Sequence, residues 1–319
     1  MNNFINRRAI IFGLKGTKLT KSERKLIKSY KPWGIILFAR NIKNLEQLKL
    51  LINSIKNTIK DDNYPILIDQ EGGAVSRLNE IVNFSLFSQE YFGRIYKKDK
   101  DRILSIYKNY IDQVCSILNF TGININTVPV LDVKRKDSHK IIGSRSFSKN
   151  SNIVYKMGRL CINLYKKNKI FTVLKHIPGH GLAKCDSHYK TPVITNNKKE
   201  LINVDFKPFK MCTSLFAMTA HVIFDKYDSI NVATHSKVII NKVIRKHIGF
   251  RGILISDDIS MKALKYGLKM NTLKALDAGC NLILHCNGNI EEMNKLAKII
   301  PTVDKFTQKK TSQIYKFLR

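Results

Sequence analysis

Residues 171–188 read FTVLKHIPGHGLAKCDSH, and they join an apolar segment of strand length to a loop rich in titratable groups. The first five residues can form a buried strand, whereas the proline and two glycines that follow interrupt both helix and strand. Residues 175–188 hold three histidines and one aspartate. Because perturbed titratable groups gather at functional sites, we interpret the segment as a buried strand that ends in a functional loop.

Short apolar runs of the same kind recur along the chain. Eight strands are expected at residues 9–14, 34–38, 65–69, 124–130, 171–175, 216–221, 252–256 and 281–285. Helices are expected after the capping residues Thr20 and Asn44, over 99–118, 153–167, 237–247, 261–278 and 290–300, and over about 301–319 at the C-terminus. Buried strands that alternate with amphipathic helices form parallel βαβ units. Eight units predict an α/β protein with one domain, a (β/α)8 TIM barrel over residues 1–319.

Polar residues follow the predicted strands at the end where catalytic groups of such barrels lie. They are Arg40, Asn41, Asp69, Asp132, Lys175, His176, His221, Asp257, Asp258, His285 and Asn287. Solubility does not explain a charged or imidazole group after nearly every strand. The sequence therefore predicts an active site at the carboxyl ends of the strands.

The chain is strongly basic: 56 Lys+Arg against 24 Asp+Glu give a formal charge of +32. Such a charge attracts nucleic acid, anionic lipid or anionic polymers. The lysines are nevertheless spread along the chain, without the blocks of like charge or the interleaved aromatic residues of a nucleic-acid site. We expect no specific nucleic-acid partner, and we keep a basic protein that binds nucleic acid or anionic polymer as the alternative.

Six cysteines form no CxxC pair, which indicates free thiols in a reducing compartment. The N-terminal segment MNNFINRRAIIFGL has six consecutive apolar residues, too few for a signal sequence or a membrane span. We therefore expect a cytoplasmic protein without a membrane span.

The motif ISDDISM at residues 255–261 ends a predicted strand in two carboxylates. Consecutive side chains of an extended segment point in opposite directions, so only one of Asp257 and Asp258 can face the centre of a pocket. We expect the other carboxylate to cap a helix or to hold a neighbouring segment.

Two further motifs contribute polar groups. IDQEGGAVSR at residues 68–77 contains Asp69 and Arg77, which can hydrogen-bond vicinal hydroxyls. IIGSRSF at residues 141–147 contains Arg145, whose guanidinium is a rigid donor for a carboxylate, a phosphate or a sugar oxygen. Each motif alone has only moderate specificity.

Together the motifs resemble a known family. DQEGG-x-V-x-R, IG-x-RSF, KH-x-PGHG-x4-DSH, AHVIF and SDD-x-SM, in this order, are similar to the β-N-acetylhexosaminidases of glycoside hydrolase family 3, bacterial cytoplasmic enzymes of peptidoglycan recycling. The resemblance runs from about residue 11 to residue 287. It implies a retaining exo-β-N-acetylglucosaminidase that releases terminal non-reducing N-acetylglucosamine from muropeptides. The expected protein is a monomer that binds this small carbohydrate substrate and has no cofactor and no metal.

The resemblance also implies residue roles. Asp257 would be the nucleophile that forms a covalent glycosyl-enzyme, and Asp186 and His188 would form the acid/base dyad. The N-acetylglucosamine ring would be held by Asp69, Arg77, Arg145, Lys175 and His176. Elementary chemistry agrees, because an imidazole gives and retakes a proton near neutral pH and an aspartate can orient it. His180 is expected to have a structural role in the turn.

Other activities could use the same residues. A β-glucosidase or an N-acetylglucosaminide phosphorylase would use the same site. A metal-dependent hydrolase could bind its metal through His176, His180, Asp186 and His188. The spacing of these residues matches neither H-x-H nor HE-x-x-H, so we do not expect a metal site.

Overall fold

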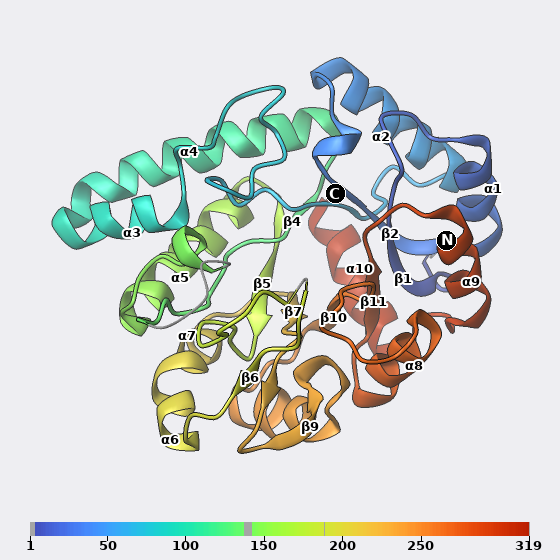
Figure 1. Ribbon diagram of the computed structural model, residues 1–319. Helices are drawn as coiled ribbons and strands as arrows, with labels where there is room; N and C mark the ends of the chain where they lie inside the picture. Colours follow the sequence, from blue (N-terminus) through green and yellow to red (C-terminus); the bar gives the residue numbers. More distant parts are fainter. Residues whose placement is uncertain (1–3, 137–141, 188, 319) are drawn as a thin grey trace.

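The computed structural model describes residues 4–136, 142–187 and 189–318, and its central feature is a closed barrel of parallel strands surrounded by helices (Figure 1). The barrel strands are β1 (Arg8–Gly13), β2 (Pro32–Leu37), β3 (Ile66–Ile68), β4 (Ile125–Asn126), β5 (Phe171–Ile177), β7 (Phe216–Thr219), β10 (Ile253–Asp258) and β11 (Leu282–His285). They follow one another around the barrel in chain order, and β11 pairs with β1. Each overlaps a predicted run, so the predicted (β/α)8 barrel is confirmed.

The helices cover the outside of this barrel. They are α1 (Lys21–Tyr30), α2 (Leu45–Ile59), α3 (Gln89–Lys98), α4 (Lys100–Thr121), α5 (Ser151–Lys167), α6 (Lys198–Glu200), α7 (Lys207–Met211), α8 (Leu268–Ala278), α9 (Ile290–Ile299) and α10 (Lys305–Leu318). Short 3₁₀ segments are η1 (Ala39–Asn41), η2 (Gly143–Arg145) and η4 (Ala233–His235), and π-helical segments are η3 (Leu201–Asp205) and η5 (Ile239–His247).

Both predicted helix starts are confirmed. Thr20 accepts a hydrogen bond from the Glu23 backbone N–H (3.1 Å), and the Glu23 carboxylate accepts one from the Thr20 N–H (2.8 Å). Asn44 accepts from the Gln47 N–H at 2.8 Å. These bonds satisfy backbone donors that the first turn of a helix leaves unpaired.

Several features differ from the predictions. Helix α3 and the helical segments over residues 198–211 were not expected. The helix expected over 261–278 begins only at Leu268, because residues 261–267 form turns in which the Ala263 N–H donates to the Ser187 carbonyl. A small sheet of β6 (Val193–Ile194), β8 (Ile223–Phe224) and β9 (Asp228–Val232) was not predicted. Two of its strands have two residues each, too few for a readable alternation of polar and apolar positions.

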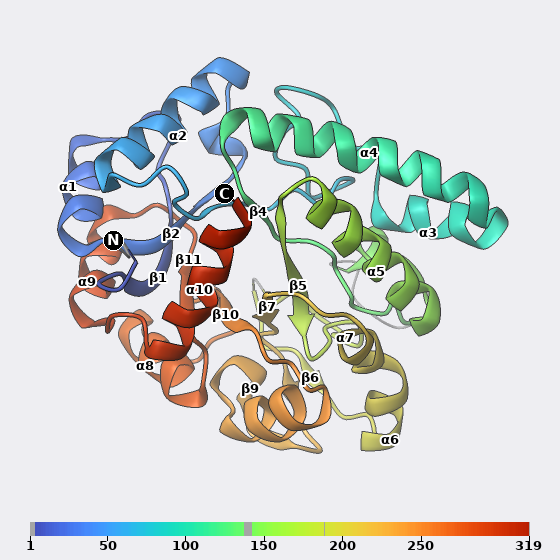
Figure 2. The ribbon, with the colours of Figure 1, turned by 180° about the vertical axis from the view of Figure 1, so that it is seen from behind.

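The C-terminal helix α10 lies across the end of the barrel at which the strands begin (Figure 2). The Trp33 indole N–H, at the start of β2, donates to Thr311 at 2.9 Å, and the ring of Phe317 packs against that of Phe171, at the start of β5. This end of the barrel is therefore covered, and the carboxyl ends of the strands face the other side.

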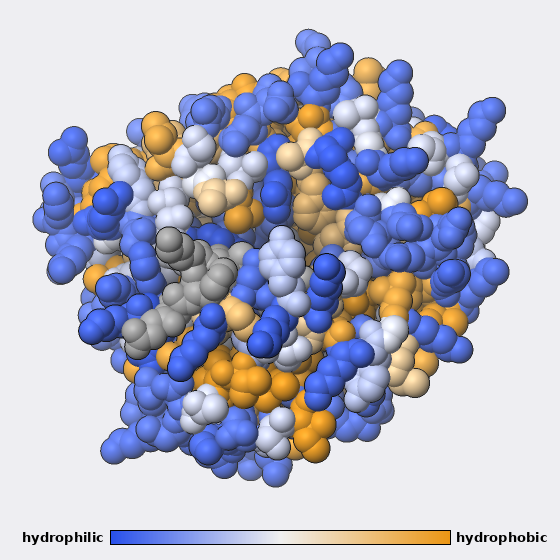
Figure 3. Space-filling model, in the orientation of Figure 1, coloured by the Kyte–Doolittle hydropathy of each residue, from blue (hydrophilic) through white to orange (hydrophobic). Residues whose placement is uncertain are grey.

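On the face shown in Figure 3, hydrophilic side chains predominate and apolar ones form separate patches. No helix in the described ranges is long and apolar enough to cross a membrane.

A buried ion pair joins the N-terminal segment to the connection after α2, and Tyr315 of α10 contacts both members. The Arg7 side chain, which is 1% exposed, pairs with Asp61, and its guanidinium lies over the rings of Tyr64 and Tyr315. The Tyr315 hydroxyl donates to the same Asp61 oxygen at 2.6 Å. Arg7 is therefore the cation that contacts the buried carboxylate of Asp61.

We expect Arg7→Leu to lower the free energy of unfolding by about 3–5 kcal/mol, because it leaves a buried carboxylate without its cation. Urea unfolding measures this change. The control is Lys108→Ala in the exposed pair Lys108–Asp112, which should cost less than about 0.5 kcal/mol. Equal losses of unfolding free energy in the two variants would show that the buried pair stabilises the protein no more than the exposed pair.

Candidate active site

A cavity of about 190 Å³ lies at the carboxyl ends of the barrel strands. Six of the predicted site residues line it, namely Asp69, Arg77, Arg145, Lys175, His176 and Asp257. Asp186 is half-buried on the loop after β5 and is not part of this lining. His188 lies outside the described residues. The structure therefore brings together residues that are up to 188 positions apart in the chain, Asp69 and Asp257.

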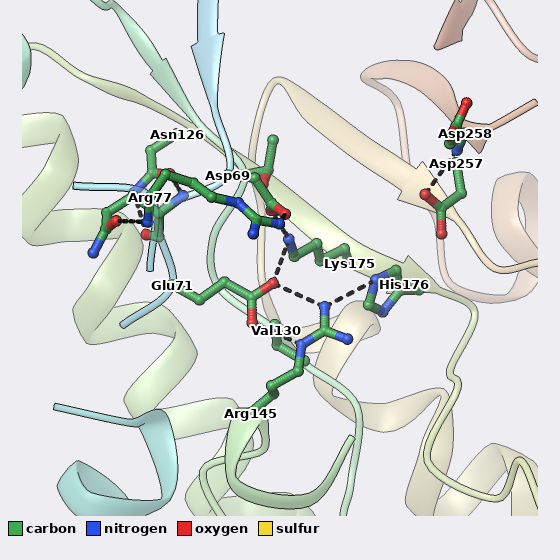
Figure 4. A network of polar contacts seen from close by, with 12 residues as sticks. Asp69, Glu71, Arg77, Asn126, Val130, Arg145, Lys175, His176, Asp257 and Asp258 are labelled. Carbon is green, nitrogen blue, oxygen red and sulfur yellow. Dashed lines mark hydrogen bonds and ion pairs between the residues drawn. The ribbon is translucent and has the colours of Figure 1, made fainter. Parts of the chain in front are cut away.

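An ion network forms one wall of the cavity (Figure 4). Lys175, whose side chain is 2% exposed, pairs with Asp69 and, at 2.6 Å, with Glu71. Arg145 donates from Nε and Nη2 to the two oxygens of Glu71, both at 2.8 Å, and Arg77 donates to Asp69 at 2.9 Å. Three cationic side chains thus share two carboxylates, and these ion pairs fix the orientation of each cationic group.

Both carboxylates of the network stay ionised at neutral pH. Burial alone would raise the pKa of Asp69, but the charges of Lys175 and Arg77 hold it well below the ordinary value. Burial also opposes ionisation of Glu71, and the charges of Arg145 and Lys175 again keep its pKa low. Glu71 lies in the DQEGG motif but was not among the predicted site residues, because its role depends on partners more than 70 residues away.

Asp132 orients the imidazole of His176. Its Oδ2 lies 2.7 Å from His176 Nδ1, and the carboxylate is fully buried. Nδ1 therefore donates its proton to Asp132, and Nε2 is the ring acceptor, 3.5 Å from Arg145 Nη2. The sequence predicted that Asp132 follows a strand but did not predict its pairing with His176, because the two residues are 44 positions apart.

The two carboxylates at the end of β10 have different surroundings. Asp258 accepts from the Ser260 hydroxyl (2.8 Å) and from the Cys286 backbone N–H (3.2 Å), so it joins β10 to the end of β11. Asp257 Oδ1 accepts from the Asp258 backbone N–H at 2.8 Å, and among the described residues no backbone N–H donates to its other oxygen. Both residues border the cavity, and Asp258 holds a neighbouring segment as one of the pair was expected to do.

Asp257 is kept ionised by its neighbours. Burial would raise its pKa, but the imidazoles of His221 and His176 and the Asp258 N–H hold it below the ordinary value. His221 is itself fixed, with Nδ1 2.7 Å from the Thr234 hydroxyl and Nε2 donating to the Asp258 carbonyl at 3.0 Å. An anionic oxygen is therefore present at the cavity wall.

The loop after β5 runs close to this wall. The His180 backbone N–H donates to Asp132 at 2.7 Å, which agrees with the structural role expected for this residue in the turn. Its ring also borders the cavity, which was not expected. Further along, Ser187 borders the cavity as well, and the Asp186 carbonyl accepts from the N–H groups of Tyr189 and Lys190.

Comparison with known proteins places this geometry in a family. The family model described as the glycosyl hydrolase family 3 N terminal domain matches residues 7–315. A curated "Beta-hexosaminidase" of Haemophilus influenzae is 33% identical over 290 residues, which cover 88% of this chain and 79% of that protein. The protein of the same name from Neisseria meningitidis serogroup B is 32% identical over 293 residues, covering 89% and 79%.

A solved structure is similar over nearly the whole chain. NagZ from Neisseria gonorrhoeae, in complex with N-trifluoroacetyl-D-glucosamine, is 27% identical with a TM-score of 0.87, and the match covers 98% of this chain and 91% of that chain. Family model, curated relatives and structural neighbour agree with the motifs and with the predicted enzyme class, a glycosidase. The chain belongs to glycosyl hydrolase family 3, among its beta-hexosaminidases.

Proposed function

We propose that this family 3 glycosidase is a retaining exo-β-N-acetylglucosaminidase that hydrolyses terminal non-reducing N-acetylglucosamine from muropeptides. One observation carries the proposal: an ionised Asp257 lies across the cavity from the donors of the ion network (Figure 4). A retaining glycosidase needs such an anion on one side of the sugar and fixed hydrogen-bonding groups around the ring.

In the first step, an oxygen of Asp257 attacks the anomeric carbon of the sugar while the bond to the leaving group breaks. His188 gives its proton to the leaving oxygen, and Asp186 stabilises the imidazolium before the transfer. In the second step, His188 takes a proton from water, the water oxygen attacks the same carbon, and the Asp257 carboxylate is released. Two inversions give net retention.

The ion network would bind the sugar ring. Asp69 can accept from hydroxyl groups, while Arg77, Arg145 and Lys175 can donate to sugar oxygens. His176, with Nδ1 bound to Asp132, presents Nε2 to the cavity as an acceptor. Since these groups are already fixed by one another, little conformational entropy is lost when substrate binds.

Exo action fits the depth of the site. Buried apolar side chains of the barrel strands, Ile36, Met218 and Leu284, line the same cavity as the polar groups. The interior of such barrels is packed, so a glycan chain can enter only by its end. The preference for N-acetylglucosamine rests on the names of the curated relatives and on the N-acylglucosamine that the Neisseria gonorrhoeae protein binds. We further propose that the protein acts in the cytoplasm as a monomer, without metal or cofactor.

Asp257→Asn should lower kcat on an aryl N-acetyl-β-glucosaminide by at least about a thousandfold, because the amide cannot serve as the nucleophile. Its melting temperature should stay within a few degrees of the wild type. Asp277→Asn, at an exposed position of α8, is the matched control and should keep full activity. Wild-type turnover by the Asp257 variant would contradict its role as the nucleophile. A wild-type protein that is inactive on every N-acetylglucosaminide would contradict the proposed substrate.

His188→Ala should slow glycosylation by about 10²–10⁴-fold for substrates with poor leaving groups, and little for dinitrophenyl substrates, whose leaving group needs no proton. Pre-steady-state measurement of phenol release separates this step from hydrolysis of the intermediate. His247→Ala, on η5, controls for the loss of a histidine elsewhere. A uniform loss across leaving groups would exclude His188 as the proton donor.

A further inference from the structure

The segment that contains Asp186 is hydrogen-bonded to the turns that follow β10, the strand of Asp257. The Ala263 N–H donates to the Ser187 carbonyl at 3.1 Å, and the Thr191 hydroxyl donates to the Ala263 carbonyl at 2.6 Å. Ala263 lies in the turns that follow β10, five residues after Asp258. Ser187 and Thr191 are therefore both hydrogen-bonded to the backbone of Ala263.

A third bond holds the same segment from the β5 side. His180 Nε2 lies 3.3 Å from the Ser187 hydroxyl, and the two residues are only 3% and 4% exposed. Within the described part of the chain, His180 Nδ1 has no hydrogen-bond partner, so Ser187 is the polar contact of this ring. The backbone of His180 is in turn held by Asp132, which also orients His176. Segments that follow β5 and β10 thus bond Ser187 directly, and Asp132, which follows β4, holds it only through His180.

The His180 ring is suited to holding a position and not to transferring protons. Burial, and next the proximity of His176, lower the pKa of His180 to about 4, so the ring is neutral at pH 7. A neutral buried imidazole has one N–H and one acceptor, and it can share a hydrogen bond with a hydroxyl without placing a charge in the cavity.

We propose that His180 is a positioning residue for the acid/base step: its bond to Ser187 holds the residue between Asp186 and His188 at the border of the cavity. This inference rests on the proposed function, since it concerns the proton donor of that reaction. Ser187 stands between the two members of the dyad, so a shift of its side chain moves both. A displacement of about 1 Å in a reacting group can cost on the order of a hundredfold in rate.

The test compares Ser187→Ala, His180→Leu and the double variant on two N-acetyl-β-glucosaminides, one with an alkyl and one with a dinitrophenyl leaving group. Because kcat/KM reports glycosylation, it isolates the step in which the leaving group is protonated. Each single variant should lose about 10–100-fold in kcat/KM on the alkyl substrate and less than about threefold on the dinitrophenyl substrate. The double variant should lose no more than either single one, because all three break the same bond.

His180→Gln can place an amide near the position of Nε2, and it should restore much of the alkyl-glycoside activity lost in His180→Leu. His247→Leu is the control for removing a histidine and should behave as the wild type. Equal losses on both substrates, or losses that multiply in the double variant, would overturn the positioning role even if the enzyme is active. A wild type that cleaves neither substrate would instead contradict the proposed function.

Discussion

The candidate site depends on the burial of one cation, Lys175. A lysine that is almost completely removed from water is stable in the charged form only beside carboxylates, and Asp69 and Glu71 supply them. Each of these acids then binds an arginine, Arg77 and Arg145 respectively. The charge of Lys175 thereby joins the end of β5 to the end of β3 and to η2, three segments that the chain brings together only in the closed barrel.

The site divides into a rigid half and a half that is assembled by loops. Asp69, Lys175 and His176 lie on or directly after barrel strands, and the arginines of the ion network, Arg77 and Arg145, come from the connections but are held by the carboxylates that follow β3. Asp257 is equally close to its strand, on β10. The proposed proton donor instead comes from the loop after β5, whose place depends on bonds such as that between Ser187 and Ala263. The barrel therefore positions the nucleophile directly and the acid/base group only through loop contacts.

Much of this arrangement could be predicted from the sequence. Most of the eight strands are apolar runs followed by polar residues, and helix starts such as Thr20 with Glu23 depend on neighbours in the chain. The partners of a buried charge could not be predicted, because Glu71 with Arg145 and Asp132 with His176 are pairs set by barrel closure. For His180 only a structural role in the turn was predicted, because its contact with Ser187 and its place at the cavity also depend on the fold. The small β6–β8–β9 sheet was missed because such short strands have no periodicity.

The central claim is that Asp257 forms a covalent bond to the sugar, and trapping that intermediate tests it most directly. A 5-fluoro N-acetylglucosaminyl fluoride keeps a good leaving group and slows the second step, so a retaining enzyme accumulates the glycosyl-enzyme. After proteolysis, mass spectrometry should find one added sugar on the peptide that contains Asp257, and no label in Asp257→Asn. Label on another carboxylate, or rapid turnover with inversion at the anomeric carbon and no label, would contradict the account.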